Sequence, residues 1–156
     1  MKRIVAILLA VVAIATALPA VAANGEGPPP EQLFQQFDLF GTWATDCSTA
    51  ASPANPHVKI SQPSPGLILE EHHLGADYAV NRYSVLSAER LSNTQLSVVV
   101  LFHPGAEGQE RQKLIFAIRD HTRRTLFNQA DGGPVRVKDG IALARGSQTP
   151  LLHKCE

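Results

Sequence analysis

The sequence has few of the residues from which redox, metal and nucleic-acid sites are built. Cysteine occurs only twice in 156 residues, as Cys47 and Cys155, and no Cys-x-x-Cys pair is present. Lys plus Arg and Asp plus Glu each number 14, so the formal net charge is zero. Binding to a phosphate backbone requires an excess of basic residues. The balanced charge therefore argues against a nucleic-acid partner.

The motifs of the common enzyme classes are also missing. The chain has no G-x-S-x-G nucleophile motif, no phosphate-binding glycine loop, no H-E-x-x-H zinc motif and no EF-hand loop. His72 and His73 are adjacent, so on a strand they point to opposite faces and cannot easily share one metal ion. Glu70 and His72 share a face and form a candidate metal or acid–base pair. We expect no cofactor and favour a non-catalytic protein, with an enzyme built from dispersed histidines and carboxylates as an open alternative.

Long apolar runs are confined to the N-terminus. A basic start at 1–3, an apolar run at 4–17 and small residues at 20–23 are typical of a secretory signal peptide. The apolar run is shorter than the ~20 residues needed to span a bilayer. We therefore predict a signal peptide at 1–23, a flexible leader at 24–30, no membrane span in the mature protein and a periplasmic location.

A short helix is predicted directly after the leader. Leu33, Phe34, Phe37 and Phe40 recur at helical spacing and give the segment one apolar face. Gly41 follows and would end the helix. Such a face must pack against something, so we expect the helix to cap the mouth of a β-structure.

After residue 41 the apolar residues alternate with polar ones, which is typical of strands with one buried face. Gly- and Pro-rich segments separate the strands, and Asp139-Gly140 favours a two-residue hairpin. Short strands at intervals of about 8–12 residues indicate an antiparallel barrel or sandwich. We predict an all-β fold at 31–156, an antiparallel β-barrel (or closely related sandwich) of about eight strands in a single domain with a short N-terminal capping helix. The predicted strands are 42–46, 57–61, 67–72, 78–86, 96–102, 113–118, 125–129, 134–137, 141–144 and 151–155.

The two cysteines allow a single intramolecular pairing. A disulfide between Cys47 and Cys155 would persist in an oxidising compartment and join the first and last strands. In the chain-entropy model, closing a loop of about 100 residues contributes up to about 4.7 kcal/mol. A redox or metal-binding thiol is the alternative, but no second thiol lies near either cysteine in the sequence. We favour the structural disulfide.

The densest polar run lies at 119–124, with the sequence Arg-Asp-His-Thr-Arg-Arg. Such a run can form an edge that binds an anion or a partner. It can also be a solvated hairpin tip whose charges discourage strand pairing between molecules. We favour the hairpin tip.

The segment Gly41-Thr42-Trp43, directly after the predicted helix, resembles the Gly-x-Trp motif at the start of the first strand of lipocalins. Lipocalins also carry a basic residue on a late strand that packs over this Trp, a role that Arg145 could fill here. Many of them tie the C-terminal segment to the barrel with a disulfide, as Cys155 could do. The resemblance covers these residues and the overall architecture, and a mid-chain lipocalin motif is missing.

Two functions follow from a barrel of this kind. An eight-stranded barrel can hold one small ligand or be filled by its own side chains. Our leading hypothesis is a periplasmic binding protein for a small apolar ligand, with Trp43, Phe102 and Phe116 as candidate ligand-binding residues. The alternative is a protein–protein module, since the periplasmic lysozyme inhibitors are similar in size and build. An envelope protein would then be the partner.

Overall fold

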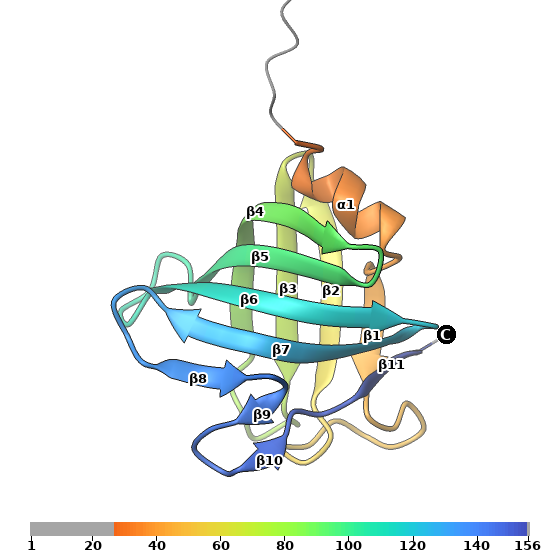
Figure 1. Ribbon diagram of the computed structural model, residues 1–156. Coiled ribbons are helices and arrows are strands. Elements are labelled where there is room, and N and C mark those ends of the chain that lie inside the picture. Colours follow the sequence, from red (N-terminus) through yellow and green to blue (C-terminus); the bar gives the residue numbers. More distant parts are fainter. Residues whose placement is uncertain (1–26, 156) are drawn as a thin grey trace, which may run out of the picture.

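Eight antiparallel strands close into a barrel in the computed structural model, which describes residues 27–155 (Figure 1). The strands of the closed ring follow the order β7-β11-β1-β2-β3-β4-β5-β6, and β6 pairs back with β7. The predicted all-β barrel is therefore confirmed. The predicted signal peptide at 1–23 and most of the leader lie outside the described residues, and 27–29 form neither helix nor strand.

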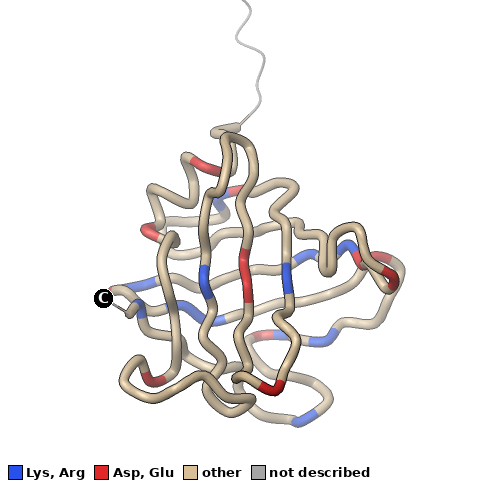
Figure 2. The backbone as a smooth tube through the Cα atoms, turned by 180° about the vertical axis from the view of Figure 1, so that it is seen from behind, with Lys and Arg blue, Asp and Glu red and all other residues tan. Residues whose placement is uncertain are grey.

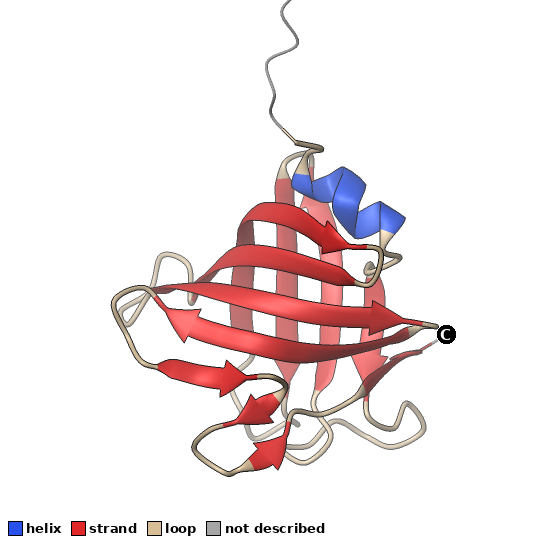
Figure 3. Cartoon of the chain, viewed as in Figure 1, coloured by secondary structure: helices blue, strands red, loops and turns tan. Residues whose placement is uncertain are grey.

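Strands make up most of the described chain, as the red segments of Figure 3 show. Outside the closed ring, β8 pairs with β7 at two positions, β9 pairs with β8, and β10 pairs with β9. The elements are α1 (Pro30–Gln36), β1 (Gly41–Ala44), β2 (His57–Ser64), β3 (Leu67–His73), β4 (Asn81–Ser92), β5 (Gln95–Phe102), β6 (Glu110–Arg119), β7 (Thr122–Ala130), β8 (Val135–Lys138), β9 (Ile141–Ala142), β10 (Ser147–Gln148) and β11 (Leu152–Cys155).

Most strands differ from their predicted bounds by at most three residues, and two cases differ by more. The segment expected at 78–86 is β4, which begins at Asn81 and continues to Ser92. Register shifts between Val85 and Ser87 and between Arg90 and Ser92 interrupt the alternation of apolar and polar residues in β4. The second half of the strand therefore lacks the pattern from which strands were predicted. The pair Ser147 and Gln148 forms β10, where only a turn was expected, because two exposed polar residues carry no strand signal.

The turns of two hairpins have the backbone geometry expected from the sequence. Asp139 and Gly140 both have positive φ, at 51° and 77°, and they connect Lys138 to its partner Ile141. This is the type I′ geometry that Asp-Gly favours. Positive φ angles also occur at Asp120 and His121, between β6 and β7. The tip of the polar run at 119–124 is therefore a tight, exposed turn, as expected.

The helix is shorter than expected and ends four residues before Phe40. Asp38 adopts a positive φ of 51° just after the cap residue Phe37. The N–H of Leu39 donates to the carbonyl of Phe34 at 2.9 Å, and the N–H of Asp38 donates to that of Gln35 at 3.0 Å. This pair of bonds is the Schellman motif, which usually employs glycine in the left-handed position. An Asp in that position hid the helix end from a glycine-based prediction.

The helix closes one end of the barrel (Figure 1). It contacts β4, and its Leu33 and Phe34 side chains are completely buried. Trp43 is buried beneath them, and its indole N–H donates to the Leu39 carbonyl at 2.8 Å. A continuous apolar core fills this end, with Ile60, Ile68, Leu96, Val98 and Ile118 from the strands. The expected capping helix and the buried Trp below it are therefore present.

Charges on the outer wall alternate in sign. Lys59 of β2 lies opposite Glu71 of β3, which in turn lies opposite Arg82 of β4. Arg82 donates from Nε to Glu71 at 2.9 Å. Figure 2 shows this row of blue, red and blue positions across three neighbouring strands. Cross-strand pairs of opposite charge support the register of the sheet.

The disulfide lies at the seam of the barrel, where neighbouring strands share the fewest paired residues. The last strand, β11, pairs with β7 at only two positions and with β1 at three, whereas β5 and β6 pair at eight. Cys155 lies on β11, and Cys47 follows β1 in the adjacent turn, so the Cys47–Cys155 disulfide holds β11 in place. The predicted disulfide is confirmed. It spans 108 residues of sequence.

Removing the disulfide should therefore destabilise the whole barrel. For a Cys47→Ser/Cys155→Ser variant we expect a loss of about 2–5 kcal/mol in the free energy of unfolding. Urea denaturation followed by far-UV circular dichroism measures it, with reduced wild type as the control. Equal denaturation midpoints for the variant and the oxidised wild type would show that the seam does not depend on the bond.

Candidate functional site

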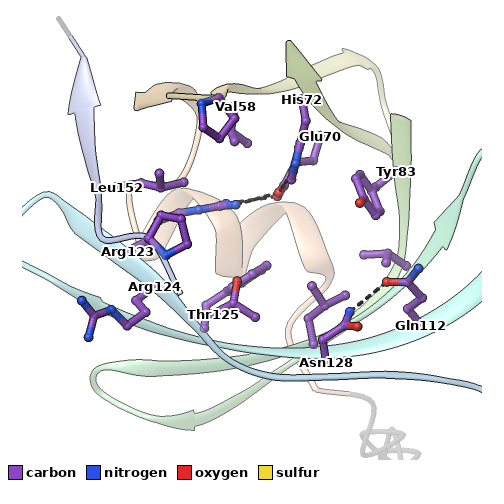
Figure 4. A pocket seen from close by; sticks show the side chains of 15 residues that line it. Val58, Glu70, His72, Tyr83, Gln112, Arg123, Arg124, Thr125, Asn128 and Leu152 are labelled. Carbon is purple, nitrogen blue, oxygen red and sulfur yellow. Dashed lines mark hydrogen bonds and ion pairs between the residues drawn. The ribbon is translucent and has the colours of Figure 1, made fainter. Parts of the chain in front are cut away.

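The end of the barrel opposite α1 contains a cavity of about 220 Å³. Its lining comes from the start of β2, β4 and β11, from the end of β3 and β5, and from positions along β6 and β7. Antiparallel neighbours bring these strand ends to the same rim. Most of the wall is apolar or aromatic, including Val58, Val100, Leu114, Phe116 and Leu152. Figure 4 shows the lining side chains from close by.

A buried ion pair lies inside this cavity. Glu70 of β3 and Arg123 of β7 are 7% and 3% exposed. Arg123 donates from Nη2 to Oε1 of Glu70 at 2.6 Å and from Nη1 to Oε2 at 3.0 Å. Both carboxylate oxygens are thus engaged by one planar guanidinium, the geometry that makes a buried pair strong.

Aromatic rings support the charge of Arg123. The guanidinium carbon lies 4.6 Å from the ring centroid of Phe116 and 5.9 Å from that of Trp43. A cation above an aromatic face is attracted to the negative charge of the π system. Trp43 belongs to the packed end, so Arg123 separates that end from the cavity.

His72 completes the buried group. Its Nε2 donates to Oε1 of Glu70 at 2.7 Å, and it lies two residues along the same strand. Burial alone raises the pKa of Glu70, but the charge of Arg123 and the hydrogen bonds from His72 and Arg123 outweigh it. The pKa of Glu70 is therefore held well below its usual range, and the side chain is a carboxylate at neutral pH.

A second polar chain crosses the opposite wall. Gln112 is buried and donates from Nε2 to Glu110 at 2.6 Å, while its Oε1 accepts from Nδ2 of Asn128 at 2.8 Å. A carboxylate only accepts, so the contact with Glu110 fixes which way both amides point. Glu110 is also bound by both Nη atoms of Arg136 at 2.7 Å. Within the described part of the chain, Oδ1 of Asn128 makes no hydrogen bond, so it can accept one.

Rings of His72, Tyr83 and Phe102 line the mouth of the cavity, and His103 packs against the last of them. Ring centroids are 4.9 Å apart for His72 and Tyr83, 4.9 Å for Tyr83 and Phe102, and 3.7 Å for Phe102 and His103. Tyr83 and Phe102 face each other directly across β4 and β5. Burial, with a smaller contribution from the charge of Glu70, raises the pKa of Tyr83 to about 12. The phenol is therefore neutral.

The structure does not bring the three candidate ligand-binding residues together. Phe116 lines the cavity, and Phe102 lines the shallower hollow at its mouth. Trp43 lies at the packed end and is not part of the cavity wall. Glu70 and His72, the candidate metal or acid–base pair, do form a hydrogen bond. However, within residues 27–155 no three His, Cys, Asp or Glu side chains gather as a metal site would require.

Sequence reasoning missed Arg123, which it placed in a solvated hairpin tip. The pairing register of the β6–β7 hairpin indicates which way Arg123 faces. A two-residue turn at Asp120-His121 pairs Ile118 with Arg123, so both side chains lie on the same face of the sheet. Apolar residues alternate along β6, and this alternation places Ile118 on the buried face of the sheet. The same register would have predicted a buried arginine.

Arg145 does not pack over Trp43, contrary to the lipocalin-based expectation. It is exposed in the turn after β9. Two other basic side chains lie near the indole instead, each 5.9 Å from its centroid: Arg123 and Lys154. Lys154 lies directly opposite Trp43 on β11 and also binds Asp38 at the end of the helix.

Losing one member of the Glu70–Arg123 pair should destabilise the protein, whereas replacing both members together should not. Glu70→Gln leaves a buried guanidinium without its counter-charge, so we expect a loss of about 3–5 kcal/mol in the free energy of unfolding. A Glu70→Leu/Arg123→Met variant removes both charges and should recover most of that loss. Urea denaturation of the three proteins measures the difference. Equal stability of Glu70→Gln and wild type would contradict the role of the pair.

The same pair predicts how stability depends on pH. A carboxyl whose pKa is lowered by folding contributes its full stability above its unfolded pKa, near the ordinary value of 4.5. That contribution is lost as the pH falls below 4.5. We expect the Tm of wild type to drop more steeply between pH 5 and 3 than that of the Glu70→Leu/Arg123→Met variant. Parallel slopes in differential scanning calorimetry would show that Glu70 does not titrate in this way.

No family model matches this chain, and neither a curated protein nor a solved structure matches it. Within the described residues, none of the helical structure is long and apolar enough to cross a membrane.

Proposed function

We propose that this protein is a non-catalytic, lipocalin-like binding protein that holds a small, mainly apolar ligand in the open end of its barrel. The observation that carries the proposal is the division of the barrel. One end is filled by the capping helix and its apolar core, whereas the other end encloses about 220 Å³ between mostly apolar walls. Ligand sites are concave and apolar, with a few polar groups that orient the ligand.

The volume limits the size of the ligand. An apolar cavity of about 150 Å³ is large enough for benzene, whereas drug-sized ligands occupy pockets of about 300–1,000 Å³. The present cavity of about 220 Å³ lies between these limits. It suits a molecule with one or two rings, or a short chain, and not a long lipid tail.

The polar groups of the cavity favour binding over catalysis. Both oxygens of Glu70 already accept hydrogen bonds from Arg123, and one also accepts from His72. A carboxylate with a lowered pKa is a weak base, and a phenol with a pKa of about 12, as in Tyr83, does not ionise near neutral pH. Neither group suits a general base at pH 7.

The surface gives less support to a protein–protein module. Such a module would gather exposed apolar side chains on one loop. The large exposed apolar residues are dispersed instead over the loop before β4, β4 itself, the turn after β9 and the residue before β11. They are Tyr78, Leu86, Leu91, Leu143 and Leu151. We keep the small ligand as the proposed function.

An exported location completes the proposal. The disulfide that closes the barrel seam would persist in an oxidising compartment such as the periplasm. The N-terminal sequence has the basic, apolar and small-residue regions of a signal peptide.

A change inside the cavity should displace the ligand, whereas the same change on the outer wall should not. Leu114 lines the cavity, and Leu126 lines a groove on the outer face of β7. We expect wild type and Leu126→Trp, purified from their own cell envelope, to carry a small molecule in native mass spectrometry. Leu114→Trp should lose it, because the indole fills the space. A clean unliganded mass for wild type would contradict the proposed function.

A further inference from the structure

We propose that the cavity selects a planar, uncharged aromatic molecule that carries a hydrogen-bonding group, such as a phenol or a small neutral heteroaromatic compound. This inference rests on the proposed binding function and names its ligand class. Three features of the cavity lead to it. Its carboxylates are already paired with cations, and aromatic rings line its wall. Uncharged polar atoms that make no hydrogen bond within the described residues face its interior.

Every carboxylate of the site already has its own cation. Glu70 is paired with Arg123 inside the cavity, and Glu110 is paired with Arg136 at the rim. Arg124 borders the cavity, but strand alternation turns its side chain away from the interior (Figure 4). Its Nη1 donates to Gln148 of β10, and its Nε is buried without a hydrogen-bond partner among the described residues. A charged ligand would have to lose its hydration here without gaining a free counter-charge, which is unfavourable in a buried site.

Arg123 in particular is not available to an anion. Both of its Nη atoms donate to Glu70, and rings of Phe116 and Trp43 lie against it. An incoming carboxylate would have to displace Glu70, which is 7% exposed and also bound by His72. An incoming cation would meet the positive charge of Arg123 and find both oxygens of Glu70 occupied.

The rings offer a stacking surface for a flat ligand. Tyr83 borders both the cavity and its mouth, and its neighbours His72 and Phe102 lie with ring centroids 4.9 Å away on either side. Aromatic pairs prefer offset or tilted contacts with centroids about 4.5–7 Å apart. A planar ring entering from the mouth can make such contacts in sequence, which a saturated ring of the same size cannot.

Uncharged polar atoms face the same space. Among residues 27–155, no hydrogen bond involves the hydroxyl of Tyr83. The carbonyl of Thr125 accepts from the Thr149 hydroxyl, and no hydrogen bond within this part of the chain involves the Thr125 hydroxyl. Oδ1 of Asn128 likewise has no partner among the described residues. None of these three atoms is fully buried, so each can be reached from the cavity or its mouth. A site that offers unpaired donors and acceptors discriminates against a ligand that cannot pair with them.

A set of matched probes tests the ligand class. Phenol, benzoate, benzylamine and cyclohexanol have similar size but differ in charge or planarity, and isothermal titration calorimetry at pH 7 measures their affinities. We expect phenol to bind most tightly and the two charged probes to bind at least about tenfold more weakly, since their charge remains unpaired. Cyclohexanol should also bind more weakly than phenol.

The two tyrosines of the chain supply a matched pair of variants. Tyr83→Phe keeps the ring of the cavity and removes its hydroxyl, so it should weaken phenol binding about tenfold but leave toluene binding nearly unchanged. Tyr78→Phe makes the same change at an exposed loop position and should have no effect on either probe.

The outcomes separate the ligand class from the binding function. Benzoate, benzylamine or cyclohexanol binding as tightly as phenol would overturn the neutral aromatic class while leaving a small-ligand barrel in place. Equal loss of phenol affinity in Tyr78→Phe and Tyr83→Phe would also overturn it. Failure of all four probes to bind wild type would overturn both the class and the proposed function.

Discussion

The ion pair between Glu70 and Arg123 is the interaction on which the rest of the structure depends. A small barrel has room for its own side chains or for one small ligand, and this barrel divides its interior between the two. Below the pair, Trp43 and the residues of the capping helix fill the space. Above it, the side chains leave a cavity. The bidentate geometry, the hydrogen bond from His72 and the rings around Arg123 together compensate for removing two charges from water.

The disulfide and the ion pair act on the same part of the wall. Arg123 lies directly opposite Leu152 of β11, in one of the two residue pairs that join β11 to β7. The Cys47–Cys155 bond keeps β11 in this narrow seam. Opening the seam would expose the floor of the cavity to water, so a bond at the edge of the barrel protects a charge pair in its interior. Stability and the ligand site are coupled through one short strand.

The local patterns of the sequence predicted most of the fold. Alternation, turn residues and the single possible cysteine pairing led to the barrel, its capping helix and its disulfide. The helix end escaped prediction because Asp38 takes the position that glycine usually holds. The Glu70–Arg123 pair escaped because it joins residues 53 positions apart, and only barrel closure brings them together. A family-based expectation misplaced the basic residue near Trp43, assigning to Arg145 a position that Lys154 and Arg123 share.

The central claim is that a neutral ring molecule occupies the space above the ion pair, inside the barrel. Intermolecular nuclear Overhauser effects between phenol and methyl-labelled protein test it most directly. The account predicts contacts from the phenol ring to the methyl groups of Val58, Leu114 and Leu152, which line the cavity. Contacts confined to Leu126 and Leu151, which line the outer groove, would contradict it.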